Sequence, residues 1–289
     1  MRTPPARCSP KSPHREAARV KLALALGGGA GLGWAHIGVL HALAARNVNV
    51  VAVSGTSIGA LAAVCLAAHR VNVLEELARS TNVRSMMRFL DIDFGRSALL
   101  GGRAVQRELR HQFGHTRLED LFIPCAVVAA DLVAGEEVAL TRGEIVPAVR
   151  ASIAIPGIFP PVRHDGRLLV DGGVMTPVPV RAARALSNAP VLAVNLQGDY
   201  ANRSETWLRR QRAARHGGLS PTRVGRAGLS LIMMHVARQS LALDPPDFEL
   251  APRIGHIDVR NFTRADELIA LGAASVDENW EMIVRIGGR

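Results

Sequence analysis

Short apolar segments alternate with segments of helical periodicity near the start of the 289-residue chain. Residues 20–26 (VKLALAL) and 48–55 (VNVVAVSG) are the apolar runs of two predicted strands. Residues 33–46 and 57–70 place apolar side chains at helical spacing and predict two helices. This order predicts a parallel βαβ arrangement with a right-handed crossover, and strands that are apolar throughout suit a sheet buried on both faces.

The alternation continues toward the C-terminus. More strands are predicted at residues 122–133, 136–143, 167–174 and 189–196, and more helices within residues 143–162, 177–186 and 265–286. The first of these helices runs into a proline-rich loop, and residues 73–118 mix helical and irregular patterns. The pattern therefore predicts an α/β fold, a three-layer sandwich with a mostly parallel central sheet.

One domain is predicted over residues 19–289, after a disordered basic tail at residues 1–18. The apolar run that follows the tail, LALAL, is too short for a secretory signal. Residues 199–228 are basic, contain glycine and show little periodicity, so a mobile excursion is predicted there. We expect no membrane-spanning helix, because no run of about 18 apolar residues occurs without glycine turns or charges.

Arginine dominates the charge of the chain. Of 35 basic residues all but Lys11 and Lys21 are arginine, and the net charge is +10. Such a uniform bias resembles codon composition more than selection for phosphate contacts, so nucleic acid is not an expected partner. A cationic surface still favours peripheral association with an anionic membrane.

The three cysteines, Cys8, Cys65 and Cys125, are far apart in the sequence. Their spacing matches neither a disulfide framework nor a metal site, so we expect a reducing compartment and no metal. The predicted location is cytoplasmic, including the inner face of the membrane.

A glycine-rich loop, GGGAGLG at residues 27–33, separates the first predicted strand from its helix. A Walker loop would need a Gly-Lys-Ser/Thr sequence, and the loop has no lysine. A dinucleotide fingerprint would need a small residue in place of Leu32 and an acid about twenty residues later, but none occurs between Glu16 and Glu75. No cofactor is therefore predicted, and the bare loop amides suit an anion that exists only in a transition state.

The motif GTSIG, residues 55–59, lies where the second predicted strand meets its helix. The flanking glycines, Gly55 and Gly59, permit a sharp turn that points Ser57 outward, as in a nucleophile elbow. On the pattern alone, Ser57 is more often the N-cap of such a helix than a nucleophile.

A serine nucleophile needs a base, and the sequence offers histidines and an acid. His36 is predicted to be packed or capping, whereas His164 and His256, at loop or strand ends, stay candidates. Asp171 ends an apolar strand, where the active-site groups of α/β sheets gather. The Asp-Gly-Gly sequence that it begins could also be an ordinary turn.

Taken in order, the motifs GGGAGLGWAHIGVL, GTSIG, ASIAIPGIFPPV and VDGG resemble the patatin-like phospholipase family, especially bacterial members related to neuropathy target esterase. The resemblance covers residues 20 to about 198 and partly returns at DPPDFEL and the closing helix. It implies the patatin-like variant of the α/β-hydrolase fold. It also implies a lipid ester substrate and a reaction that needs no metal or cofactor.

The resemblance implies roles for particular residues. Ser57 would be the nucleophile and Asp171 its base, without a catalytic histidine. The oxyanion hole would consist of the amides of Gly28, Gly29 and Ala30. The glycines that support the motifs are Gly55, Gly59, Gly172 and Gly173.

The chain departs from the family at Leu32, where many members carry Arg or Lys. The lost charge affects the expected rate more than the reaction type. The segment Ala151–Pro161 is expected to line the site, while Met233 and Met234 suit either an acyl groove or the core. Trp207, beside arginines in the basic excursion, suits either an anionic interface or a solvated loop.

Two rival functions stay open at this stage. One is a Ser-His-Asp esterase with a downstream histidine such as His256 as the base. The other is a non-enzymatic lipid-binding or regulatory protein that retains the fold.

Overall fold

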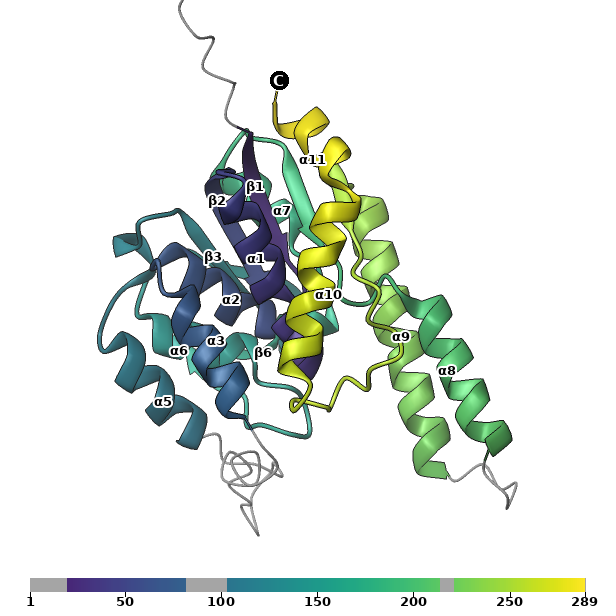
Figure 1. Cartoon of the computed structure of the whole chain (residues 1–289). Helices are drawn as coiled ribbons and strands as arrows, with labels where there is room; N and C mark the ends of the chain where they lie inside the picture. Colours follow the sequence, from purple (N-terminus) through teal and green to yellow (C-terminus); the bar gives the residue numbers. More distant parts are fainter. Residues whose placement is uncertain (1–19, 82–102, 214–220, 289) are drawn as a thin grey trace, which may run out of the picture.

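A computed structural model describes residues 20–81, 103–213 and 221–288 (Figure 1). The predicted tail at residues 1–18 lies outside them. The strands are β1 (Lys21–Leu26), β2 (Asn49–Thr56), β3 (Cys125–Asp131), β4 (Glu136–Leu140), β5 (Val162–His164), β6 (Arg167–Asp171), β7 (Val191–Val194) and β8 (Phe248–Leu250). The helices are α1 (Ala35–Ala45), α2 (Ile58–Ala67), α3 (Val71–Ser80), α5 (Arg103–Phe113), α6 (Ile145–Ser152), α7 (Val180–Leu186), α8 (Tyr200–Ala213), α9 (Pro221–Leu243), α10 (Ala265–Glu278) and α11 (Trp280–Gly287). Short 3-10 helices are η1 (Ala30–Trp34), η2 (Leu118–Asp120) and η3 (Gly172–Val174).

The strands form one sheet in the order β5-β6-β3-β2-β1-β7-β8, with β4 also paired to β3. The neighbours from β3 through β2, β1 and β7 to β8 run parallel, whereas β4, β5 and β6 join by antiparallel pairing. The predicted α/β fold with a mostly parallel sheet is confirmed.

The central strand β1 shows why the sheet has a helical layer on each face. Leu22, Leu24 and Leu26 belong to the large core cluster that contains apolar residues of α1, α2 and α10. The alternate residues Ala23 and Ala25 pack instead with residues of α7. Since successive side chains of a strand point to opposite faces, an apolar residue at every position buries both faces. Figure 1 shows α1, α2 and α10 together on one side of the sheet and α7 on the other.

Strand β3 brings two strand ends together. Its residues 125–128 pair in parallel with the end of β2, and its residues 129–131 pair antiparallel with the end of β6. Because β4 pairs with residues 127–131 of β3, we infer that β2 and β6 share its other edge. The last residue of β2, Thr56, lies opposite Val128, and the last residue of β6, Asp171, lies opposite Ala129. The two strands therefore meet end to end.

The structure differs from the expected elements in three places. The weakly patterned excursion at 199–228 is largely helical, because residues 200–213 form α8 and residues 221–243 form α9. The closing helix is interrupted at Asn279, which separates α10 from α11. The three-residue strand β5 was not predicted, since its sequence, VRH, alternates too briefly to give a signal.

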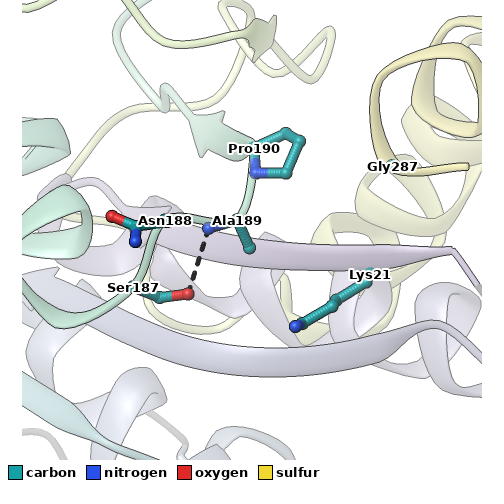
Figure 2. A pocket seen from close by; sticks show the side chains of 6 residues that line it. All are labelled: Lys21, Ser187, Asn188, Ala189, Pro190 and Gly287. Atoms are coloured by element: carbon teal, nitrogen blue, oxygen red, sulfur yellow. Dashed lines mark hydrogen bonds between the residues drawn. The ribbon is translucent and has the colours of Figure 1, made fainter. Parts of the chain in front are cut away.

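A cavity of about 410 Å³ lies at the end of the sheet where β1 and β7 begin (Figure 2). Its lining residues are Lys21, Ser187, Asn188, Ala189, Pro190 and Gly287. Lys21 is the first residue of β1 and Pro190 precedes β7, whereas β2 ends beside Ser57 at the opposite end of the parallel strands. The cavity is therefore separate from the site described next.

Candidate active site

The turn at Ser57 has the geometry of a nucleophile elbow. Ser57 connects β2 to α2 with φ of 57° and ψ of −126°, a backbone conformation that costs energy in a residue with a side chain. It occupies the N-cap position of α2, but its side chain makes no capping hydrogen bond. Instead, its hydroxyl donates to Oδ2 of Asp171 at 2.6 Å. The capping alternative is therefore not what the structure shows.

Close backbone packing explains the glycines that flank Ser57. A Cβ atom at Gly59 would overlap the carbonyl oxygen of Leu26, and one at Gly55 would overlap the carbonyl of Gly59. A Cβ atom at Gly172 would lie 2.5 Å from the carbonyl oxygen of Val128. Only glycine lets these chain segments approach so closely, so the elbow and the end of β6 can lie against β3.

Asp171 is buried and held by three hydrogen bonds. Its Oδ1 accepts from the amide of Gly173 at 2.8 Å, its Oδ2 accepts from Ser57, and its own amide donates to the carbonyl of Ala154 at 3.0 Å. Burial raises the pKa of Asp171 from 3.8 to about 6, and the hydrogen bonds from Ser57 and Gly173 oppose this rise. The carboxylate is ionised near neutral pH and is more basic than an exposed aspartate.

Ser152 supports the elbow and was not singled out by the sequence. Its hydroxyl accepts from the amide of Ser57 at 2.8 Å and donates to the carbonyl of Val128 at 2.6 Å. Ser152 is fully buried, so this hydroxyl satisfies two buried backbone groups that water cannot reach. Ser152 lies in the ASIAIPG motif, which was expected to line the site. The sequence of that motif does not reveal that a serine at the end of a helix contacts a residue 95 positions away.

The glycine loop lies beside Ser57, and its amides differ in whether they already have a hydrogen-bond acceptor. A Cβ atom at Gly28 would lie 3.3 Å from Cβ of Ser57. The amide of Gly28 donates to the carbonyl of Pro177 at 2.9 Å, whereas the expected role in an oxyanion hole would require this amide to face a ligand. The amides of Gly29 and Ala30 have no hydrogen-bond acceptor within the described part of the chain.

The segment from Thr176 to Pro179 ties the loop, the elbow and Asp171 together. The Thr56 hydroxyl donates to the carbonyl of Thr176 at 2.9 Å, and the Ser54 hydroxyl donates to the carbonyl of Pro179 at 2.7 Å. With the Gly28–Pro177 bond, these contacts fix the chain that follows Asp171 against both β2 and the glycine loop.

His36 anchors the first residue of the glycine loop. Its Nε2 lies 2.8 Å from the carbonyl oxygen of Gly27, an acceptor, so the proton is on Nε2. Burial lowers the pKa of His36 to about 4, and the hydrogen bond to Gly27 only partly offsets this. His36 is therefore neutral near pH 7 and has the packing role predicted from the sequence.

The other candidate histidines have different partners. His256 Nε2 lies 2.9 Å from Oε1 of Glu267, and His164 Nε2 lies 3.6 Å from the carboxylate of Asp165. The Ser57 hydroxyl has Asp171 as its hydrogen-bond partner in the structure.

The remaining candidates fall into two groups. Leu32 and Met234 are both buried. Met233 is half-buried, and its Cε would lie 3.4 Å from a Cβ atom at Gly173. Leu32 is part of the core cluster under the loop, a place that suits an apolar side chain in this chain.

The described residues offer neither a metal site nor a membrane-spanning helix. They contain no group of three or more His, Cys, Asp and Glu side chains placed to hold a metal ion. No helix among them is both long and apolar enough to cross a bilayer.

Comparison with known proteins identifies the family. Residues 24–184 match the model of the patatin-like phospholipase family, so the chain belongs to this family. An uncharacterised NTE family protein of Mycobacterium tuberculosis is 37% identical over 198 residues, which cover 66% of this chain and 55% of that protein. The chain thus spans about half the length of this relative.

Two animal proteins and one solved structure are also similar. Patatin-like phospholipase domain-containing protein 7 of Mus musculus is 32% identical over 65% of this chain and 14% of its own length. Neuropathy target esterase sws of Drosophila melanogaster is 30% identical over 61% of this chain and 13% of its own length. VipD from Legionella pneumophila superposes with a TM-score of 0.47 and 15% identity over 93% of this chain and 67% of that one.

Replacing Asp171 with Asn should stabilise the fold, increasingly so as pH rises. The folded wild type keeps Asp171 protonated up to about pH 6, whereas the unfolded chain ionises it above 3.8. Wild-type stability is therefore lost as pH rises through this window, by up to about 3 kcal/mol, and Asp171→Asn avoids the loss. Urea unfolding at pH 4, 5, 6 and 7 measures the difference, which should grow with pH. A difference independent of pH would contradict the buried carboxylate.

Removing the Ser152 hydroxyl should destabilise the elbow. Ser152→Ala leaves the Ser57 amide and the Val128 carbonyl unpaired in the interior, at a cost of about 2 kcal/mol. Ser204→Ala, which removes an exposed hydroxyl that bonds only within α8, is the matched control and should change little. Chemical denaturation of both variants gives the comparison. Equal stability of Ser152→Ala and wild type would show that the two hydrogen bonds do not matter.

Proposed function

We propose that this chain is a serine lipid acyl hydrolase of the phospholipase or lysophospholipase type, with Ser57 as nucleophile and Asp171 as base. The observation that carries the proposal is the 2.6 Å hydrogen bond from the Ser57 hydroxyl to a buried carboxylate, at a strained elbow. Membership of the patatin-like phospholipase family, and the esterase and phospholipase named among the relatives, support a lipid ester as substrate.

In the acylation step, Asp171 takes the proton of the Ser57 hydroxyl as Oγ attacks the ester carbonyl carbon. The carbonyl π electrons move to oxygen and form a tetrahedral oxyanion. When this collapses, the bond to the alcohol or lysolipid oxygen breaks, and Asp171 returns the proton to the leaving oxygen. The raised pKa of Asp171, about 6, suits both transfers, because a base works best when its pKa lies near the working pH.

The free amides of the glycine loop are suited to stabilise the oxyanion. We assign this role to Gly29 and Ala30, since Gly28 already donates to Pro177. Each donor in comparable sites contributes about 3 kcal/mol to the transition state. The positive φ of Ala30, 49°, turns the backbone sharply between these two amides and the rest of η1.

In the deacylation step, water attacks the acyl-serine. Asp171 accepts a proton from the water, the acyl–oxygen bond breaks, and the proton passes to Ser57 Oγ. The cycle releases a fatty acid and restores both side chains.

The contacts of His256 and of Ser57 bear on the two rival functions. His256 bonds to Glu267, and the base position next to Ser57 holds Asp171, so a Ser-His-Asp mechanism has no support in the geometry. The geometry favours an enzyme over a non-enzymatic lipid-binding protein. The strained elbow and the buried carboxylate both lower the stability of the fold, and a binding protein would need neither. We retain the predicted cytoplasmic location as part of the proposal; Cys65 and Cys125 are buried free thiols.

Three variants test the catalytic assignment. Ser57→Ala and Asp171→Asn should each lower kcat/KM on 4-nitrophenyl butyrate by about a thousandfold or more, whereas His256→Ala should stay near wild type. A panel of phosphatidylcholine, lysophosphatidylcholine and triacylglycerol, run on wild type and Ser57→Ala, identifies the lipid class. Labelling by a fluorophosphonate that persists in Ser57→Ala would contradict the nucleophile. Comparable loss in His256→Ala would favour the histidine mechanism.

The pH profile tests Asp171 as the base. Only the ionised carboxylate accepts a proton, so kcat/KM should rise with pH and level off above a midpoint near the pKa of about 6. Initial rates on the soluble ester from pH 4.5 to 8 give the profile. The midpoint of the pH profile should be the same in a variant that alters only distant surface charges. A midpoint near pH 7 that is absent from the profile of His256→Ala would refute Asp171 as the base.

A further inference from the structure

Exposed large apolar side chains gather at the end of the sheet where Ser57 lies. Leu132 and Val133 are exposed in the turn that follows β3, with Val133 81% exposed. Val174 and Met175 are exposed just after Asp171. The first half of α9 adds four more, Val224, Leu229, Leu231 and Ile232. Soluble proteins rarely leave so many large apolar groups near one site without a partner.

The sheet topology places three separate segments at this end. Strands β2 and β3 run parallel, so the turn that follows β3 lies at the same end of the sheet as Ser57, which follows β2. Val174 and Met175 follow Asp171 in the chain after the two glycines Gly172 and Gly173. Helix α9 runs in the opposite direction to the parallel strands, because its end leads to Asp247, whose amide donates to the carbonyl of Val191 at the start of β7. The beginning of α9 therefore lies toward the end of the sheet where β2 ends, and Figure 1 shows α9 side by side with α8 at one side of the molecule.

Helix α9 changes character along its outer surface. Its inner side is buried through Met234, Ala237 and Leu241. Its outer side carries the four exposed apolar residues up to Ile232, and from there His235, Arg238 and Gln239 are exposed instead. Met233, between the two regions, reaches the backbone at Gly173. Apart from Leu243 at the last position of the helix, the exposed large apolar residues of α9 therefore lie in its first half.

The charge of α8 and α9 indicates what covers this apolar side. The two helices contain seven arginines and one acidic residue, Glu205. Segments that combine apolar and basic side chains bind anionic lipid surfaces, where the headgroups attract arginine and the acyl region accepts apolar groups. A second copy of this chain would bring two arginine-rich segments together across a symmetric interface, which like-charge repulsion opposes.

We propose that the outer side of the first half of α9, together with Val174–Met175 and Leu132–Val133, is a docking surface for an anionic lipid bilayer. The proposal rests on the proposed function, since docking there brings the ester bonds of lipids to the end of the sheet that holds Ser57. We name these residues the apolar rim. The excess of arginine over acidic residues in the sequence of α8 and α9 favours negative headgroups.

Vesicle flotation of the full chain tests the apolar rim. The vesicles are phosphatidylcholine alone, or phosphatidylcholine with an equal part of phosphatidylglycerol. Wild type should float with the anionic vesicles, less with the neutral ones, and less again with added salt. The double variant Leu229→Gln, Ile232→Gln should lower the vesicle partition coefficient by about tenfold or more. The reason is that two apolar side chains, which the bilayer would cover, are replaced by polar ones.

The matched control is Leu243→Gln. Leu243 is 76% exposed on the same helix, but at its other end, away from the apolar rim. This variant should float like wild type. Turnover of soluble 4-nitrophenyl butyrate should be unchanged in both variants, whereas hydrolysis of vesicle lipid should fall only in the double variant.

The outcomes separate docking from catalysis. Equal flotation of wild type and the double variant, or an equal loss in Leu243→Gln, overturns the apolar rim. A different result also overturns the apolar rim as a membrane surface: wild type does not float, light scattering shows that it is a dimer, and the double variant is a monomer. The apolar rim would then contact a second copy of the chain. Flotation that follows the expected pattern in a protein without ester hydrolysis upholds docking and refutes the proposed function.

Discussion

The meeting of β2 and β6 at one edge of β3 is the constraint on which the candidate site depends. A hydroxyl and a carboxylate that are 114 residues apart in the chain become hydrogen-bonded because both strands end beside Val128 and Ala129. The glycine at position 172 lets β6 end close against β3, and the hydroxyl of Ser152 joins the elbow to the Val128 carbonyl. Backbone pairing, more than side-chain packing, sets the distance between Ser57 and Asp171.

Burial of this pair has an electrostatic consequence. A carboxylate inside the protein loses hydration, so its pKa rises, and the two hydrogen bonds that it accepts recover only part of that loss. The fold therefore holds a charged group that lowers its stability near neutral pH. The same desolvation makes the group a better proton acceptor, which is the property that a serine hydrolase without histidine requires. Burial of the Asp171 carboxylate beside the Ser57 hydroxyl therefore lowers the stability of the fold and favours the proposed activity.

The glycine loop shows how neighbouring segments divide its amides. The amides of Gly27 and Gly28 donate to the carbonyls of Val194 and Pro177, and His36 donates to the carbonyl of Gly27. These hydrogen bonds fix the beginning of the loop to the neighbouring segments. The amides of Gly29 and Ala30 have no acceptor among the described residues. Family resemblance assigned three consecutive donors, but the resemblance does not show that Pro177 comes within 2.9 Å of the first of them.

The sequence alone determined the fold class, the order of most strands and helices, and the motifs that contain Ser57 and Asp171. These follow from local properties: apolar runs, helical spacing and glycines at turns. It did not predict α8 and α9, because arginine and glycine in that stretch obscure the helical period. Only the tertiary structure decided that Asp171 approaches Ser57 on an antiparallel strand, that Ser152 supports the elbow, that Gly28 is already bonded, and that exposed apolar residues from three segments share one end of the sheet. Each of these depends on residues far apart in the chain, and a local pattern carries no information about such distances.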